Sequence, residues 1–105
     1  MPPGLEVHIA HEAGSTTATV VGEVDLLTSV ALNRELDMAL DAGPEWLRLD
    51  LRDVVFMDTS GIAVLIKARR RALEAGCRFS VKSASPAIQR LLEITGLASL
   101  LNEPG

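Results

Sequence analysis

The sequence predicts an α/β fold in which helices pack against a mixed four-stranded sheet. Three observations carry this prediction. Short runs alternate apolar and polar residues, as half-buried strands do, and longer runs between them carry apolar residues at helical spacing. Two successive strand–helix–strand units imply parallel neighbouring strands joined by right-handed crossovers. The chain of 105 residues has the length of one domain, so we expect a single domain over residues 1–105 with an ordered core of about residues 5–101.

A strand pair is expected at the start of the chain. After a loose start at residues 1–4, residues 5–9 alternate apolar and polar side chains and predict a half-buried strand. Residues 16–21 are rich in β-branched side chains, which favour a second strand. The turn candidate at residues 13–15 leaves only a short gap, so we expect an antiparallel hairpin.

A helix is expected next, from Thr28 or Ser29, either of which is able to cap it, to about Ala42. Gly43-Pro44 ends this helix, because glycine suits the C-terminal cap and proline is unable to continue. Residues 46–52 alternate again and predict a third strand, with leucines on one face and charged side chains on the other. The apolar stripe of the helix consists of Leu32, Leu36, Ala39 and Leu40.

The second helix is expected to follow Gly61 and to run to about Ala75, where Gly76 stops it. Its second half carries cationic side chains at residues 67–71. We interpret them as a solvated face rather than a nucleic-acid site, because aromatic residues are not interleaved and the net charge of the chain is −4. The expected buried face of this helix consists of Ile62, Leu65, Ile66, Ala72 and Leu73.

A fourth strand and a third helix complete the predicted order. Residues 77–82 alternate, and we expect Cys77 to be a small core residue rather than a reactive thiol. Ser85-Pro86 predicts a helix start, with serine as cap and proline in the first turn. Thr95-Gly96 closes that helix, and residues 97–101 are expected to form one last helical turn before a tail at 102–105.

Composition narrows the function classes. Because the chain is acidic, we expect no direct binding of nucleic acid. The longest apolar runs are too short to cross a bilayer, and no signal peptide is recognised, so we expect no membrane insertion. The single cysteine fits a reducing compartment, and we expect the cytoplasm.

Catalytic patterns are missing from the sequence. His8 and His11 lie three residues apart on an expected strand, so they point to opposite faces and form no ligand pair. There is no cysteine or histidine cluster at zinc spacing, and no glycine precedes the Thr59-Ser60 hydroxyls as a nucleophile elbow requires. We therefore expect no enzyme, no metal site and no cofactor.

The stretch from Val54 to Ile62 is the most informative part of the chain. An apolar run ends in an acid, two hydroxyls and a glycine, which is typical of a loop that leads into a helix. Asp58, Thr59 and Ser60 are all competent helix caps, and one interpretation is that they only start the helix. The other is that a hydroxyl is presented at the positive end of the helix, where a phosphate is tolerated.

A second polar junction, Gly22-Glu23-Val24-Asp25, follows the second strand. Gly22 allows a bend, and the two acids leave the strand end polar. Local pattern leaves two interpretations open for this junction, a solvated loop and a contact surface.

With these residues in place, the chain resembles the STAS-domain anti-sigma factor antagonists (anti-anti-sigma factors) of bacteria, over nearly its whole length. The resemblance rests on three motifs in the family's order and spacing. They are Gly22-Glu23-Val24-Asp25, the phosphorylation motif Phe56-Met57-Asp58-Thr59-Ser60-Gly61-Ile62, and Ser85-Pro86-Ala87-Ile88-Gln89-Arg90-Leu91-Leu92 followed by Ile94-Thr95-Gly96-Leu97.

The resemblance implies a STAS-like domain that works as a phosphorylation-controlled binding protein. In the family, the unphosphorylated antagonist binds an anti-sigma factor that is also an ATP-dependent serine kinase, and the sigma factor is freed. Phosphorylation then releases the antagonist, and a phosphatase resets the cycle. The acceptor is the first hydroxyl after the aspartate, which is Thr59 here, where serine is usual; Ser60 is the fallback. Expected partner contacts are Asp25, Asp58, Thr59, Ser60, Gly61 and Ile62, with Ile62 on the rim of the patch.

The threonine at the acceptor position keeps a second interpretation open. The chain would then be a STAS scaffold of a signalling assembly, or the cytosolic accessory subunit of an ABC lipid transporter, without reversible release by phosphorylation.

Overall fold

The computed structural model describes residues 2–101 of the chain; Met1 of the expected loose start and the expected tail at 102–105 lie outside the described residues. The predicted order of strands and helices is confirmed. The elements are β1 (Leu5–Glu12), β2 (Ser15–Val24), α1 (Thr28–Asp41), β3 (Trp46–Met57), α2 (Thr59–Glu74), β4 (Arg78–Ala84), α3 (Pro86–Ile94) and the short 3₁₀ helix η1 (Ala98–Leu101).

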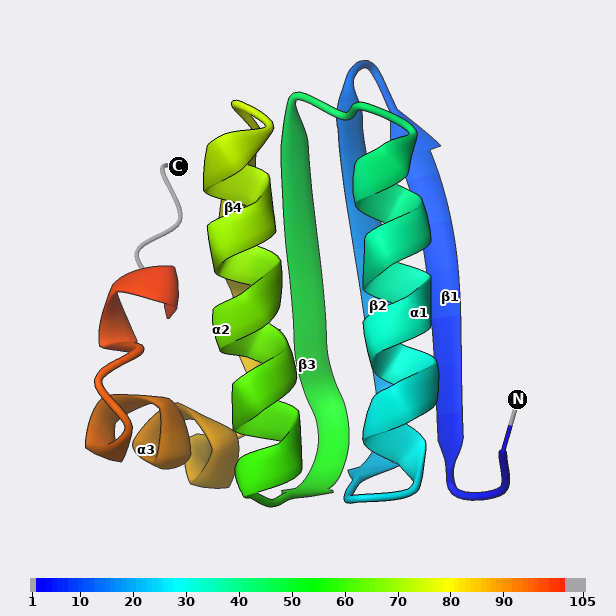
Figure 1. Cartoon of the computed structure of the whole chain (residues 1–105). Coiled ribbons are helices and arrows are strands. Elements are labelled where there is room, and N and C mark those ends of the chain that lie inside the picture. The colour runs from blue at the N-terminus through cyan, green and yellow to red at the C-terminus, as the bar shows by residue number, and fades with distance from the viewer. Residues whose placement is uncertain (1, 102–105) are drawn as a thin grey trace.

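The four strands form one mixed sheet in the order β1-β2-β3-β4. β1 pairs with β2 antiparallel, and β2–β3 and β3–β4 pair parallel, as expected from a hairpin followed by two crossover units. α1 and α2 lie side by side over one face of the sheet, and α3 and η1 lie beside the β4 edge (Figure 1). The hydrophobic core fills the space between the sheet and these helices.

The hairpin turn between β1 and β2 is formed by Ala13 and Gly14. Both residues have positive φ, 45° and 86°, as a two-residue hairpin turn with the twist of the flanking strands requires. The expected turn is confirmed, although Ser15 already belongs to β2. β2 also runs three residues beyond the predicted end, so Gly22–Val24 are strand rather than loop.

The alternation predicted for β3 and β4 holds only in part. Leu47, Leu49 and Leu51 are fully buried as expected, but Asp50 and Ser80, which were expected on the solvent face, are buried as well. A register irregularity between Leu49 and Asp50 interrupts the β3–β4 pairing, and α3 contacts both strands. Asp50 accepts hydrogen bonds from the backbone and the side chain of Arg52, which compensate for its burial.

The buried face of α2 is rotated from the predicted one. Ile62, Leu65 and Ala72 are buried as expected, but Ile66 is 41% and Leu73 is 80% exposed, so the prediction is wrong for these two residues. Val64 and Ala68 are buried in their place. The interval between Ile66 and Leu73 holds Arg69 and Arg70, which mark this line of the helix as solvated.

Cys77 is buried and packs in the core, as predicted. Its burial raises the pKa of the Cys77 thiol, so the thiol stays neutral near neutral pH.

Candidate functional site

The first two motifs lie at the edge of the sheet where β2 and β3 end and where α1 and α2 begin, whereas the third lies on α3 (Figure 1). Val24 and Met57 are paired across the two parallel strands, so Asp25 and Asp58 follow directly at the same edge. The backbone N–H of Asp58 donates to the Val24 carbonyl at 3.1 Å, which joins the two junctions. In open parallel sheets, this carboxyl edge is where binding sites occur.

The junction between β3 and α2 is one residue long. β3 extends to Met57, beyond the predicted end at residue 52, and α2 begins at Thr59 rather than after Gly61, so only Asp58 lies between the elements. Asp58 is the N-cap of α2: it has extended backbone dihedrals, and its carboxylate accepts from the Ser60 backbone N–H at 2.8 Å. The Asp58 side chain therefore fixes the first turn of the helix.

The two candidate acceptor hydroxyls differ in access. Thr59, the first residue of α2, is exposed, whereas Ser60 is half-buried. Among the described residues, the Thr59 hydroxyl has no hydrogen-bond partner. A modifying enzyme therefore meets a free hydroxyl at Thr59, held at the positive end of the helix dipole on a backbone that Asp58 fixes.

Gly61 and Ile62 are buried below this surface. The Ile62 side chain is only 6% exposed, so the expectation that it lies on the rim of the patch is wrong: it points into the core with Leu65. A Cβ on Gly61 would lie 2.5 Å from Met57 Cγ and 2.8 Å from Val24 Cγ1. Glycine at this position lets the start of α2 pack against the ends of both strands.

The second junction, between β2 and α1, is held by a closed set of hydrogen bonds. The Asp25 carboxylate accepts from the backbone N–H groups of Leu27 at 3.0 Å and Thr28 at 2.9 Å. The Thr28 hydroxyl accepts from the Asp25 N–H at 2.9 Å and donates to the Glu23 carbonyl at 2.8 Å. These bonds, first among them the one from the Thr28 backbone, hold the pKa of Asp25 below its ordinary value.

These contacts correct the cap predicted for α1. Neither Thr28 nor Ser29 is the N-cap, because α1 begins at Thr28 and the cap position, Leu27, has no side-chain bond to offer. Asp25, two residues earlier, supplies the carboxylate instead. Asp25 thus has a structural role, and its half-buried position also leaves part of it at the surface.

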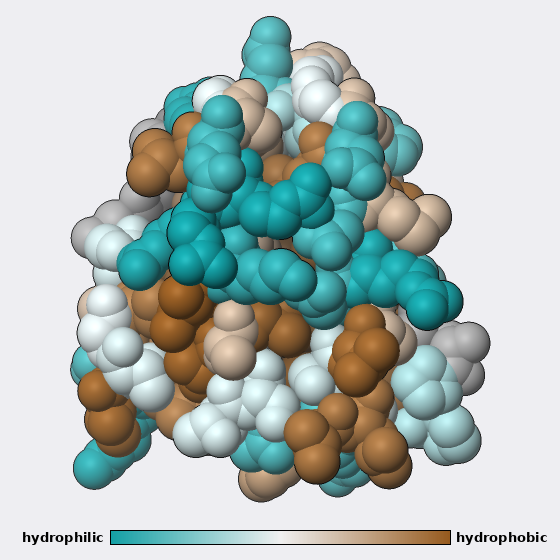
Figure 2. All heavy atoms as spheres, in the orientation of Figure 1, coloured by the Kyte–Doolittle hydropathy of each residue, from teal (hydrophilic) through white to brown (hydrophobic). Residues whose placement is uncertain are grey.

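Exposed apolar side chains lie at or next to the two junctions in the sequence, and apart from Phe56 the sequence motifs do not contain them. Figure 2 shows hydrophobic residues gathered at the end of the molecule where α1 and α2 begin, below a hydrophilic band across both helices. Leu26-Leu27 stands out in the sequence as an apolar pair just after an acidic junction, and this signal was available. We call these exposed side chains the apolar collar: Leu26 (74%), Leu27 (81%), Val30 (64%), Val55 (75%) and Phe56 (50%).

Other site types find no support in residues 2–101. Over that range, His, Cys, Asp and Glu side chains form no group of three or more that is placed to hold a metal ion. Among the same residues, each helix is too short or too polar to cross a membrane. His8 and His11 lie on β1, away from the Thr59 edge, and His11 Nδ1 lies 3.0 Å from the Thr16 hydroxyl.

Comparison with known proteins identifies relatives of the whole chain. The family model described as "Mlab, STAS domain" matches residues 7–102. The anti-sigma F factor antagonist of Paenibacillus polymyxa is 28% identical over 98 residues, which cover 92% of this chain and 84% of the relative.

Solved structures with the same fold carry related names. The crystal structure of an anti-sigma factor antagonist from Mycobacterium paratuberculosis superposes with a TM-score of 0.84 at 26% identity, covering 94% of this chain and 84% of the other. The antagonist SpoIIAA matches in its unphosphorylated form (TM-score 0.79, 15% identity, 90% and 84% covered) and in its phosphorylated form (0.73, 16%, 90% and 87%). At these identities, the likeness to SpoIIAA concerns the fold alone.

Proposed function

The chain belongs to the STAS domain family, and on that basis we propose that it is an anti-sigma factor antagonist controlled by phosphorylation of Thr59. Its unphosphorylated form binds an anti-sigma factor with ATP-dependent serine kinase activity and frees the sigma factor. The kinase phosphorylates the antagonist and so releases itself, and a phosphatase restores the binding form. The protein acts by binding in the cytoplasm and catalyses no reaction.

One observation carries this proposal: Thr59 presents a free, exposed hydroxyl at the N-terminus of α2, at the same edge of the sheet as the exposed side chains of the apolar collar. A docked partner would cover the apolar collar together with Asp25, Asp58, Thr59 and the exposed part of Ser60. Gly61 and Ile62 support this surface from beneath, since both are buried. Burial of apolar area supplies the binding free energy, and Thr59 supplies the control point.

Phosphorylation would change this surface without refolding the domain. A phosphothreonine adds a charge of roughly −1.5 to −2 at neutral pH. The N-terminus of α2 stabilises that charge within the domain. A partner packed on the apolar collar would have to remove water from this phosphate group next to the Asp58 carboxylate. A penalty of about 3–4 kcal/mol weakens binding roughly a hundred- to a thousandfold.

The experiment is a capture of partners from native cell extract, with the whole chain as bait and with or without ATP. We expect an ATP-binding anti-sigma factor to be retained without ATP and released with ATP. Thr59→Glu should lose the partner, whereas Ser99→Glu, which places the same charge on an exposed residue of η1, should retain it. Equal retention of the partner by both variants would exclude Thr59 as the control point.

A second candidate function is a STAS scaffold or transporter accessory subunit that is not switched by phosphate. The observation in its favour is the threonine at position 59, where the resemblance leads us to expect serine. The same capture distinguishes the two functions: a transporter ATPase or a large scaffold, retained whether or not ATP is present, supports the second.

A further inference from the structure

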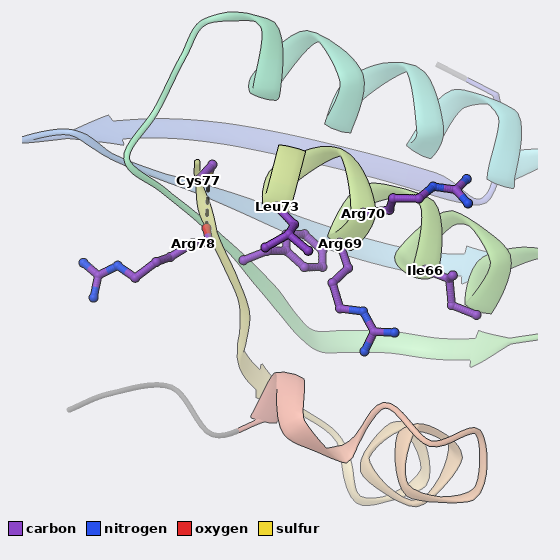
Figure 3. Close-up of a pocket in the computed structure, with 7 residues that line it drawn as sticks. Ile66, Arg69, Arg70, Leu73, Cys77 and Arg78 are labelled. Atoms are coloured by element: carbon purple, nitrogen blue, oxygen red, sulfur yellow. Dashed lines mark hydrogen bonds between the residues drawn. The ribbon is translucent and has the colours of Figure 1, made fainter. Parts of the chain in front are cut away.

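A groove beside the C-terminal half of α2 is not used by the proposed function. It has a volume of about 580 Å³ and lies between the outer side of α2 and the start of β4. Ile66, Leu73, Cys77 and Phe79 form its apolar lining (Figure 3). Along α2, Thr59 is about 10 Å from Ile66 and about 21 Å from Leu73, at about 1.5 Å per residue. The groove is therefore separate from the Thr59 edge.

The charged residues that line the groove all have one sign. They are Arg69 and Arg70 from α2 and Arg78 from β4, and no acidic residue is among the lining residues. This is unexpected in a chain whose net charge is −4. Three positive groups beside an apolar floor create a local field that attracts anions.

Two of these cations have no internal partner. Arg71, the next residue, pairs with Asp37 and Asp41 of α1. Within residues 2–101, Arg69 and Arg70 have no such pairing. Arg78 is held over the Trp46 ring, 4.3 Å from its centroid, so its guanidinium is turned from α2 (Figure 3). Arg69 and Arg70 are thus the guanidinium groups free to receive an anion.

The floor of the groove remains apolar near neutral pH. Cys77 is buried and its thiol donates to the Arg78 carbonyl at 3.2 Å. Ile66 and Leu73 are exposed, and α2 packs against the core through its opposite face without them. Covering them would remove apolar surface from water, which favours a ligand with a hydrocarbon part.

We propose that the groove between α2 and β4 binds a single-chain anionic amphiphile of the fatty-acid class. The hydrocarbon chain lies along Ile66, Leu73 and Phe79, and the carboxylate is received by Arg69, whose side chain leaves α2 on the side of Leu73 (Figure 3). The volume is within the range of small-molecule sites, roughly 300–1,000 Å³. A guanidinium suits a carboxylate because its donors match both oxygens.

The test uses the whole chain and three probes, dodecanoate, dodecyltrimethylammonium and acetate, with the two amphiphiles below the concentrations at which they form micelles. Calorimetry measures affinity, and backbone amide NMR shifts locate the bound probe. We expect one site for dodecanoate, with the largest shifts at Leu73, Cys77 and Phe79, and at least about tenfold weaker binding of the other two. Equal binding of the cationic amphiphile, or shifts centred on Leu26 and Leu27, would overturn the proposal.

Two pairs of variants complete the test. Arg69→Glu should weaken dodecanoate binding about tenfold, whereas Arg34→Glu on α1 should leave it unchanged. Leu73→Ser should weaken binding by a similar factor, and Ile94→Ser, at a residue 71% exposed on α3, should not. All four residues are exposed, so the variants are expected to fold, which their NMR spectra would verify. Equal effects within either pair would contradict the site.

Discussion

The β2–α1 and β3–α2 junctions have the same plan, a strand end followed by an aspartate and a helix, but they leave their threonines in opposite states. At the first junction, Thr28 is 4% exposed and its hydroxyl joins Asp25 to Glu23. At the second, Thr59 is exposed and its hydroxyl is free. The aspartate fixes the start of the helix at both junctions. The junctions differ in the threonine: the Thr28 hydroxyl belongs to the hydrogen-bond network, whereas the Thr59 hydroxyl is left available to a partner protein.

This difference shows how one sheet edge combines rigidity with a modifiable group. The first junction supplies fixed geometry through a closed network in which the Thr28 side chain is buried. The second uses only the Asp58 carboxylate for the cap, and this leaves the neighbouring hydroxyl available. Substitutions at matching positions of the two junctions should therefore have unequal effects on stability.

The largest expected effect comes from the glycines of the two junctions. Gly22 has φ of +112°, and a Cβ there would lie 2.1 Å from the Gly4 carbonyl oxygen. Gly22→Ala should lower the free energy of unfolding by about 3 kcal/mol or more, because backbone meets backbone. Gly61→Ala should cost less, about 1–3 kcal/mol, because its Cβ would meet the side chains of Met57 and Val24 rather than backbone. Urea unfolding of both variants measures the difference, and a smaller loss for Gly22→Ala would contradict the comparison.

A smaller effect is expected from the threonines themselves. Thr28→Val removes a hydroxyl and leaves the Asp25 N–H and the Glu23 carbonyl without this partner, at a cost of about 1–3 kcal/mol. Thr59→Val removes a free hydroxyl and should change stability by less than about 0.5 kcal/mol. Thermal unfolding of the two variants measures this difference. A similar loss of stability at both positions would show that the Thr59 hydroxyl also belongs to a hydrogen-bond network.

The smallest expected effect is the pH dependence that Asp25 contributes. Its pKa is lowered from 3.8 by hydrogen bonds from Thr28 and Leu27 that stabilise the carboxylate. Because the pKa of Asp25 is lower in the folded state than in the unfolded state, this stabilisation is fully present above the pKa of the unfolded state. It is lost as the pH falls through the pKa of the folded state. Asp25→Asn should therefore be less sensitive than the parent chain to acidification from about pH 6 to about pH 3. Urea midpoints at the two pH values measure this, and equal sensitivity would argue against the capping role.

Much of this architecture was readable from the sequence. Alternation at residues 46–52 and apolar spacing at Leu32, Leu36 and Leu40 located elements correctly, because solvent on one side imposes these periods. The side on which a polar residue ends up was harder to predict. Asp50 is buried where the β3–β4 register is irregular and where α3 contacts both strands, and these features depend on neighbouring elements.

The site was predicted in position but not in detail. Local motif residues located Asp58 and Thr59 at a helix start, since capping is a short-range interaction. Ile62 is buried and Ile66 is exposed because of the way α2 is rotated against the sheet. The helix sequence carries two lines of apolar residues and does not show which line faces the sheet. The role of Asp25 as the cap of α1 was missed because the cap lies before the helix rather than at its first residue.

The measurement that tests the central claim most directly is mapping of phosphate on the chain by mass spectrometry after incubation with its captured kinase and ATP. We predict one phosphate, on Thr59, that is lost in Thr59→Ala and kept in Ser60→Ala. An active kinase that leaves the chain unmodified, or that places the phosphate on the half-buried Ser60, would contradict the account.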